Sequence, residues 1–269
     1  MTMHLKRWLT AIIAIPLLIF LIGPGPRWLF YGVICTASLL GLMEYYTIVS
    51  ARLPKPVMWF IGLATCLLFV AIYLRQIMFV PVIILMWAIV PSAWLMLTDP
   101  LTGASETLAK ALFGPVYAAL PLALLLLIHL RPNGPAWIFF LLTVVFAGDT
   151  AAFYVGRAMG RRKLYEAVSP NKTWEGAIAG GVASLAAGSL FIRLIGPCAL
   201  SLKGLILVVL LSAAAQIGDL SESMLKRNRG VKDSGRILPG HGGMLDRIDG
   251  LLFAIPVLYI YLCLDLGMP

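Results

Sequence analysis

The chain has 269 residues, of which 61% are hydrophobic and only 12% are charged, and its mean hydropathy is +0.94. Soluble domains typically have about twice this share of charged residues, so the composition excludes an ordinary soluble domain and indicates an integral membrane protein. The formal net charge of +9 does not indicate a nucleic-acid partner. Lys and Arg gather in the cytoplasmic loops of membrane proteins, beside anionic lipid, which accounts for most of this excess.

Long apolar runs predict an all-α, polytopic membrane protein with about nine transmembrane helices. A helix needs roughly 20 mostly apolar residues to cross a bilayer. The nine candidates are 8–23, 28–49, 56–74, 77–97, 107–129, 135–157, 173–195, 202–222 and 250–267. The first candidate resembles a signal peptide, but no A-x-A-like cleavage site precedes Gly23, so we expect a retained helix.

The distribution of cationic residues predicts the orientation of the chain. When the N-terminus and every second connection are placed on one side, that side holds 16 of the 21 Lys and Arg residues. This bias places the N-terminus in the cytoplasm. The long polar loops 158–172 and 223–249 then also face the cytoplasm, where nucleotides are found. We therefore expect an integral protein of the cell (inner) membrane with its active site on the cytoplasmic side.

We divide this single membrane unit into scaffold helices, residues 1–145, and a catalytic region, residues 146–269. Nine of the twelve acidic residues lie at or after Asp149, which is itself well inside a predicted span. An ionisable group at that depth usually faces a polar cavity or a partner. In the scaffold, Glu44 lies near the cytoplasmic end of the second span, where a carboxylate snorkels, pairs with a Lys or borders a polar cavity.

Small residues recur every four positions in two consecutive predicted spans. Such stripes let membrane helices approach closely, so we expect these two helices to pack against each other or against their neighbours. The stripes are Gly148, Ala152, Gly156 and Gly160, and then Gly176, Gly180, Ser184 and Gly188.

The start of the seventh predicted span, residues 169–176, has the sequence SPNKTWEG. Asn171 or Thr173 is suited to cap the helix, leaving backbone N–H groups free at its positive end. With Lys172 beside them, this is a candidate phosphate site. The alternative is an ordinary interfacial helix start with Trp174 as an anchor.

Charge of both signs is concentrated between residues 223 and 249, SMLKRNRGVKDSGRILPGHGGMLDRID, which contain six Lys or Arg, three Asp and one His. If the preceding helix continues, one face of it carries a row of four polar side chains, namely Asp219, Glu222, Ser223 and Lys226. Asp246 and Asp249 are likewise one helical turn apart. Carboxylate oxygens suit Mg²⁺, which takes one or two of them plus waters and phosphates. The alternative is a solvated loop with structural salt bridges.

Neither zinc nor a disulfide is expected. His241 has no second His or Cys nearby, although the glycines around it allow close backbone approach to a ligand. The four Cys residues are scattered through apolar runs, without a CxxC spacing.

The polar segments resemble a known signature. The chain has Ser223-x-Leu225-Lys226-Arg227, then Lys232-Asp233-x-Gly235, then Leu238-Pro239-x-His241-Gly242-Gly243-Met244-x-Asp246-Arg247-Ile248-Asp249. This pattern is similar to the signature of the phosphatidate cytidylyltransferases, or CDP-diacylglycerol synthases. The segment Ser-Pro-Asn-Lys-Thr-x-Glu-Gly at 169–176 resembles the same family.

The resemblance implies a reaction in which CTP and phosphatidate give CDP-diacylglycerol and pyrophosphate. It implies Mg²⁺ bound by Asp219 and Asp246, with a second cation such as K⁺ nearby. The implied catalytic residues are Asp219, Lys226, Asp246 and Asp249. The implied substrate-binding residues are Asn171, Lys172, Thr173, Glu175, Ser223, Arg227, Lys232, Asp233, His241 and Arg247. The expected partners are CTP, phosphatidate, membrane lipids and, in a homodimer, a second copy of the chain.

Two other hypotheses stay open at this point. A related enzyme would use a different lipid phosphate or a polyprenyl phosphate, because residues near the phosphates do not read the acyl chains. An ion-coupled transporter would use Asp149, Asp219 and Asp246 as an ion path. Transporters of that kind are expected to have broken helices in two matching halves, and the sequence has no such internal symmetry.

Overall fold

The structure of the protein, a computed structural model, describes residues 16–51, 53–98, 103–235 and 242–266. In these residues, eight segments are long and apolar enough to cross a membrane, and they correspond to the last eight predicted spans. Their bounds are Arg27–Ile48, Lys55–Tyr73, Ile77–Thr98, Ala104–His129, Gly134–Met159, Trp174–Ile195, Leu202–Arg229 and Leu245–Asp265. Of the first prediction, 8–23, residues 16–22 are helical and residues 8–15 lie outside the described part of the chain.

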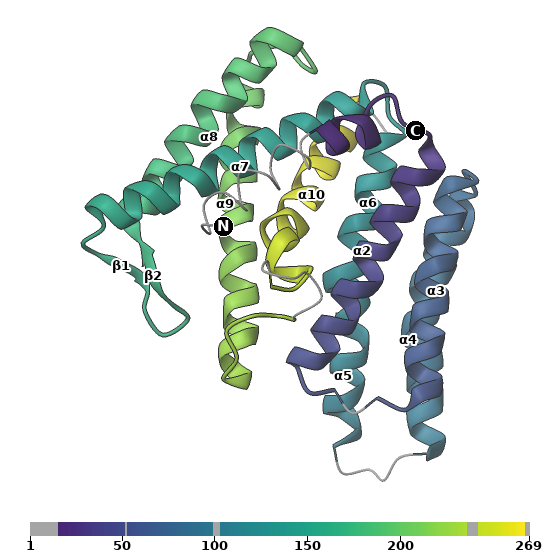
Figure 1. Cartoon of the computed structure of the whole chain (residues 1–269). Coiled ribbons are helices and arrows are strands. Elements are labelled where there is room, and N and C mark those ends of the chain that lie inside the picture. The colour runs from purple at the N-terminus through teal and green to yellow at the C-terminus, as the bar shows by residue number, and fades with distance from the viewer. Residues whose placement is uncertain (1–15, 52, 99–102, 236–241, 267–269) are drawn as a thin grey trace.

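The elements follow one another as a bundle of antiparallel and tilted helices (Figure 1). In chain order they are α2 (Arg27–Ile48), α3 (Lys55–Tyr73), the 3₁₀-helix η1 (Ile77–Phe79), α4 (Val80–Thr98), α5 (Ala104–Gly114), the π-helix η2 (Pro115–Ala119), α6 (Leu120–His129), α7 (Gly134–Met159), β1 (Lys163–Tyr165), β2 (Ser169–Thr173), α8 (Trp174–Ile195), α9 (Leu202–Arg229) and α10 (Leu245–Leu266).

The distribution of apolar side chains is that of a protein surrounded by lipid. Trp137, Phe140 and Leu211 are fully buried between helices. Large apolar side chains also cover the outside, such as Trp59 and Leu97, which are 79% and 78% exposed. A surface of this kind is costly in water but matches a hydrocarbon environment. The chain is therefore an integral membrane protein.

Helices α7 and α8 pack through the two predicted stripes of small residues. A Cβ added to Gly180 would lie 2.9 Å from the carbonyl oxygen of Gly148, and one added to Gly176 would lie 2.7 Å from that of Ala152. The hydroxyl of Ser184 donates a hydrogen bond to the carbonyl oxygen of Val144 at 2.8 Å. The predicted close approach of these two helices is confirmed.

The polar segment between α7 and α8 contains a β-hairpin, which the sequence did not predict. Strand β1 pairs antiparallel with β2, and Lys163 lies opposite Thr173. The carboxylate of Glu175 accepts hydrogen bonds from the backbone N–H groups of Arg161 and Arg162 at 3.1 to 3.2 Å. Strands of three and five residues are too short for an alternating pattern to reveal them.

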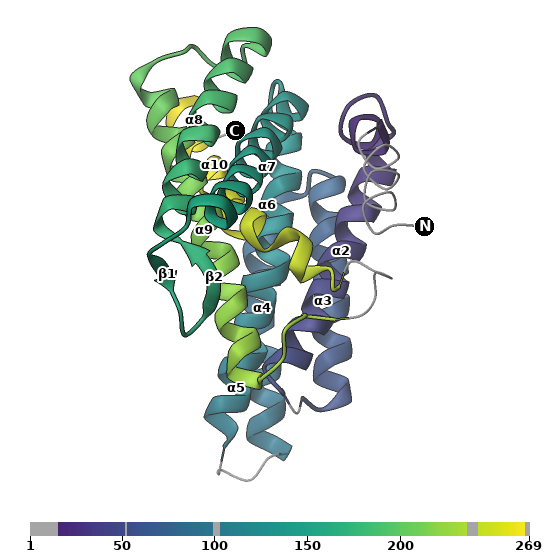
Figure 2. The same ribbon diagram turned by 60° about the vertical axis from the view of Figure 1, so that its left-hand side comes forward.

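The helices on either side of the second polar segment are longer than predicted. Helix α9 runs to Arg229 rather than ending at 222, and α10 begins at Leu245 rather than 250. Figures 1 and 2 show that α10 begins between α9 and α2, inward from the ends of both helices. The helices α9 and α10 touch closely at Gly218, where an added Cβ would lie 2.5 Å from the carbonyl oxygen of Asp249. This approach places the polar faces of α9 and α10 next to each other.

Candidate active site

Helix α9 carries a polar row along one face. Because the helix continues without a break to Arg229, the side chains of Asp219, Glu222, Ser223 and Lys226 follow one another at helical spacing, as predicted. Glu222 is the most deeply buried of them, with 0% of its surface exposed, while Asp219 and Ser223 are half-buried.

Lys226 joins the two helices. Its Nζ lies 2.6 Å from Glu222 Oε2 on the same helix and 2.6 Å from Asp246 Oδ1 on α10. The side chains of all three residues are at most 13% exposed. One ammonium group is therefore shared by two carboxyl groups in a place where an unpaired charge would be strongly destabilising.

Asp246 is held at the start of α10 by several donors. Its Oδ2 accepts hydrogen bonds from the backbone N–H of Gly243 at 2.8 Å and from that of Ser234 at 3.0 Å. The hydroxyl of Ser234 also lies 2.9 Å from the same oxygen. The position of this carboxylate is therefore fixed by the backbone on both sides of the segment that connects α9 to α10.

A second, more exposed ion pair involves the first residue of the polar row. Lys172, on strand β2, places its Nζ 2.5 Å from Asp219 Oδ2. Asp149 of α7 is close enough to interact electrostatically with both residues of this pair. Asp249 of α10 interacts electrostatically with Asp219 and with Asp149. The hairpin, α7, α9 and α10 thus contribute charged groups to one region.

Of the two predicted metal ligands, Asp219 belongs to the polar row of α9, and Asp246 lies on the adjoining helix α10, where it pairs with Lys226 of that row. Each is paired with a different lysine, and Asp249 of α10 interacts electrostatically with Asp219. Within the described ranges, no three His, Cys, Asp or Glu side chains are grouped in a way that would hold a metal ion. Mg²⁺ needs only one or two protein carboxylates when phosphates and waters supply the rest, so these donors fit an ion that arrives with a nucleotide. Joint binding of one ion by Asp219 and Asp246 stays a prediction.

The predicted residues near the hairpin have various local roles. Thr173 is buried and caps α8, its hydroxyl oxygen accepting a hydrogen bond from the backbone N–H of Gly176 at 3.2 Å. The guanidinium of Arg227 donates to the carbonyl oxygen of Val168 at 3.3 Å, which ties the end of α9 to the hairpin. Asn171 is exposed. Glu175 orders the turn before β1, as described above.

The remaining predicted residues lie after the polar row. Lys232, Asp233 and Arg247 are exposed, and Ser234 beside them is buried. His241 lies outside the described residues, so its predicted role in substrate binding stays a prediction.

Sequence reasoning did not find the contacts that Glu44 makes. This residue of α2 is only 4% exposed. Its carboxylate accepts hydrogen bonds from the backbone N–H groups of Met244 and Leu245, each at 2.9 Å, and lies 2.9 Å from the hydroxyl of Ser234. The only signal in the sequence was an isolated carboxylate in an apolar span.

Tyr117 is a second residue that the sequence did not indicate. It belongs to the π-helix η2, and its hydroxyl is buried without a hydrogen-bond partner. The hydroxyl interacts electrostatically with Glu222 and Asp249, and Glu222 Oε1 is also buried without a partner. Single turns of π-helix often occur at functional sites. The polar row therefore extends toward η2.

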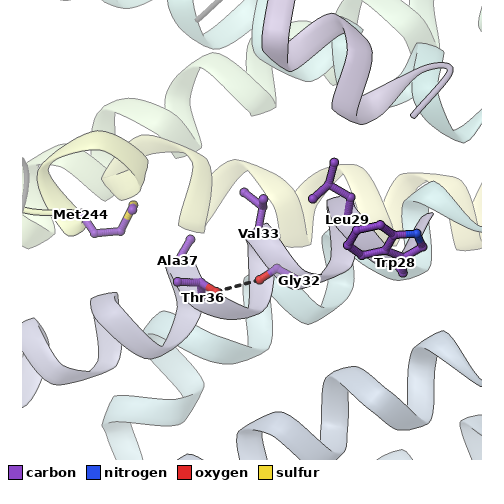
Figure 3. Close-up of a pocket in the computed structure, with 7 residues that line it drawn as sticks. All are labelled: Trp28, Leu29, Gly32, Val33, Thr36, Ala37 and Met244. Atoms are coloured by element: carbon purple, nitrogen blue, oxygen red, sulfur yellow. Dashed lines mark hydrogen bonds between the residues drawn. The ribbon is translucent and has the colours of Figure 1, made fainter. Parts of the chain in front are cut away.

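An apolar groove leads away from the site along α2 (Figure 3). It has a volume of about 400 Å³ and is lined by Trp28, Leu29, Gly32, Val33, Thr36, Ala37 and Met244. The only polar side chain in this lining, Thr36, donates its hydroxyl hydrogen to the carbonyl oxygen of Gly32 at 2.9 Å. Met244 lies at one end of the groove and Trp28 at the other, so the groove runs along α2 from the start of α10.

Comparison with known proteins identifies a family. The model of the family described as "Cytidylyltransferase family" matches residues 5–264. An uncharacterized protein of Escherichia coli (strain K12), YnbB, is 32% identical over 266 residues, which are 97% of this chain and 87% of the relative.

Stronger identity is confined to part of the chain. The phosphatidate cytidylyltransferase of Brucella suis biovar 1 (strain 1330) is 48% identical over 154 residues, 57% of this chain and 56% of the relative. The enzyme of that name from Bacillus subtilis (strain 168) is 45% identical over 137 residues, 51% of each chain. The aligned part thus spans about half the length of these two relatives.

Proposed function

Because the chain belongs to the cytidylyltransferase family, we propose that it transfers a cytidylyl group from CTP to phosphatidate, giving CDP-diacylglycerol and pyrophosphate. The observation that carries this proposal is the row of carboxylates and lysines between α9, α10 and β2, inside a bundle of membrane-spanning helices. The relatives named phosphatidate cytidylyltransferase support the choice of substrates.

The chemistry of this reaction calls for cations more than for a base. The phosphate of phosphatidate is already anionic at neutral pH, so no side chain has to remove a proton before it attacks the α-phosphate of CTP. The main obstacles are repulsion between two anions and the charge that builds on the departing pyrophosphate. Positioning in line and electrostatic stabilisation remove such obstacles.

The residues of the site have matching tasks in this proposal. Asp219 and Asp246 would hold Mg²⁺, and a second cation such as K⁺ would bind nearby. When bound, Mg²⁺ neutralises phosphate charge and orients the triphosphate. The ammonium group of Lys172 lies 2.5 Å from Asp219 Oδ2, and in this proposal it exchanges that carboxylate for a phosphate of CTP.

The groove along α2 supplies a path for an acyl chain of the lipid substrate. Its Met244 end is two residues from Asp246, and from there it runs toward Trp28, away from the cytoplasmic end of α2 in the predicted orientation. From Ala37 to Trp28 the helix rises about 14 Å, comparable to an extended chain of roughly ten methylene groups. A phosphate near Asp246 and an acyl chain in the groove would place the two ends of phosphatidate at neighbouring parts of the molecule.

The orientation is part of the proposal. We place the site on the cytoplasmic side of the cell (inner) membrane, because the positive-inside bias of the loops supports it and CTP is cytoplasmic. A homodimer is the proposed assembly, suggested only by the resemblance of the sequence to its family.

The test is release of pyrophosphate by the purified full-length protein in detergent or liposomes. With CTP, Mg²⁺ and dioleoyl phosphatidate we expect turnover that stops when any of the three is omitted. A polyprenyl phosphate and lysophosphatidate serve as competing acceptors in the same assay. Turnover with the polyprenyl phosphate alone would support the related enzyme, whereas no turnover with any acceptor would reject a cytidylyltransferase.

A further inference from the structure

Glu44 connects the N-terminal scaffold to the candidate active site. Its Oε1 accepts a hydrogen bond from the backbone N–H of Met244, and its Oε2 accepts one from that of Leu245. N–H groups at the start of a helix have no acceptor within the helix, and a carboxylate there is also favoured by the helix dipole. A residue of α2 thus caps α10, 200 positions further along the chain.

Two glycines leave room for this carboxylate. A Cβ added to Gly235 would lie 2.5 Å from Glu44 Oε1, and one added to Gly243 would lie 2.5 Å from Oε2. Neither glycine has the positive φ that by itself favours glycine. The lack of a side chain is therefore explained at Gly235 by the space that Glu44 occupies, and at Gly243 by the space that Ser234 Oγ and Glu44 occupy together.

Glu44 also shares a donor with Asp246. The hydroxyl of Ser234 lies 2.9 Å from Glu44 Oε2 and 2.9 Å from Asp246 Oδ2, and its single hydrogen serves one of them at a time. The backbone N–H groups of Ser234 and Gly243 bind Asp246 directly. Glu44 and Asp246 thus share the hydroxyl of Ser234. The backbone N–H of Gly243, which binds Asp246, is also next in the chain to that of Met244, which binds Glu44.

We propose that Glu44 is a positioning residue for Asp246. It fixes Ser234, Gly243 and the first turn of α10, so that the carboxylate of Asp246 points toward Lys226 and the polar row. The proposed function gives Glu44 no role, so this proposal goes beyond it. The proposal rests on the proposed function only where its test measures turnover. Without Glu44, the carboxylate of Asp246 would still be present, but it would be less well oriented to bind a divalent ion.

The first experiment compares Glu44→Ala and Glu44→Gln with Tyr46→Phe. Tyr46 is a matched control, because it is buried on the same helix and its hydroxyl donates to the carbonyl oxygen of Ala111 at 2.9 Å, away from the site. The readouts are the Mg²⁺ concentration for half-maximal turnover and the affinity for Mn²⁺ measured by electron paramagnetic resonance without turnover, in the absence and presence of CTP.

For Glu44→Ala we expect both constants to rise at least tenfold in protein that still elutes as a folded species. Glu44→Gln should give a smaller rise, because the amide retains one acceptor oxygen. Tyr46→Phe should lower the melting temperature and leave both constants unchanged. Wild-type constants in folded Glu44→Ala would overturn the proposal, since the residue would then only stabilise the bundle.

A second experiment uses Gly235→Ala, which keeps Glu44 but pushes against its carboxylate. We expect at least a fivefold rise in both constants, whereas Gly62→Ala, at a glycine with open space, should have no effect. In the Glu44→Ala background the same change should add less than twofold, because its target is gone. Independent, multiplicative effects would overturn the proposal. If the Glu44→Ala protein is not recovered in a folded form, wild-type values of both constants in Gly235→Ala would overturn the proposal instead.

The outcomes also separate this proposal from the proposed function. If the wild-type protein releases no pyrophosphate with any acceptor, the proposed function fails, and Mn²⁺ affinity in the same variants still decides the role of Glu44.

Discussion

Lys172 and Asp219 form an ion pair at 2.5 Å that joins the β-hairpin to α9. Both residues were predicted from the sequence as site residues, one for phosphate and one for metal, but their direct contact was not. The pair keeps a cation beside Asp219, close to Asp149 and Asp249. An incoming triphosphate with its divalent ion would compete with both halves of this pair, the phosphates for Lys172 and the ion for Asp219.

Replacing Lys172 by Ala should therefore raise the KM for CTP about tenfold, because one of the cations that offset the phosphate charge is lost. Pyrophosphate release measured against CTP concentration checks this. Lys203→Ala is the control: Lys203 also approaches an acidic residue, Asp265, at 3.8 Å, but it lies in the first turn of α9, at the opposite end of that helix from Lys226. An unchanged KM in the Lys172 variant would remove this residue from the nucleotide site.

Replacing Asp219 or Asp246 by Asn should lower turnover at least 100-fold while the protein stays folded in the membrane. The amide removes the negative charge that a divalent ion requires and changes the side-chain volume very little. Chelation of divalent ions should abolish turnover in the wild type, and added Mg²⁺ should restore it. Near-normal turnover in either variant would exclude that residue from the predicted metal site.

Lys226→Met should destabilise the protein by about 3 kcal/mol, because it leaves Glu222 and Asp246 facing each other without a cation. The family resemblance implied a catalytic role for this lysine, and its two buried ion pairs predict a large cost in stability as well. Thermal unfolding in detergent checks the prediction.

The double variant Lys226→Met, Glu222→Gln separates the two effects. Neutralising Glu222 removes one of the two unpaired charges, so the double variant should recover more than half of the lost stability but not the turnover. A double variant that is no more stable than Lys226→Met would show that Lys226 does not stabilise the protein through Glu222.

The parts of the fold that were predictable from the sequence depend on local patterns. Runs of apolar residues located eight spans because each span is continuous in the chain. The close packing of α7 and α8 followed from small residues four apart, since that spacing marks one face of a helix. The pairing of Lys226 with Glu222 was accessible too, because i and i+4 are neighbours on any helix.

The contacts that the sequence did not reveal join distant segments. Glu44 and Leu245 are 201 residues apart, and no local pattern relates them. The shared use of Lys226 by Glu222 and Asp246 depends on how α9 and α10 cross at Gly218. The helix ends were misplaced for a related reason: the charged last turns of α9 are stabilised by contacts with α10 and the hairpin, so hydropathy alone ended that helix too early.

The stripes between α7 and α8 give a matched pair of substitutions at adjacent positions. Gly180→Ile should destabilise the protein by about 2 kcal/mol, because its side chain would be forced against the backbone of Gly148. Gly181→Ile adds the same side chain where nothing lies within 4 Å, so it should be nearly neutral. Thermal unfolding of both variants in the same detergent checks this, and equal melting temperatures would contradict the described packing.

The groove along α2 predicts which part of the enzyme senses acyl-chain length. Gly32 lines the groove, and a Cβ added there meets no atom within 4 Å, so Gly32→Phe should fold and fill the groove. The KM for dioleoyl phosphatidate should rise at least fivefold, whereas the KM for dihexanoyl phosphatidate should change less than twofold. A short chain does not reach Gly32 from a phosphate bound near Asp246, and a long one does.

Gly181→Phe is the control for this change, since it places the same ring on open space of α8, away from the groove. It should leave both KM values unchanged. A rise in both KM values in the Gly32 variant would mean that the ring disturbs the headgroup site rather than the chain path. Unchanged values for both lipids would place the acyl chains elsewhere, and the groove would then hold ordinary membrane lipid.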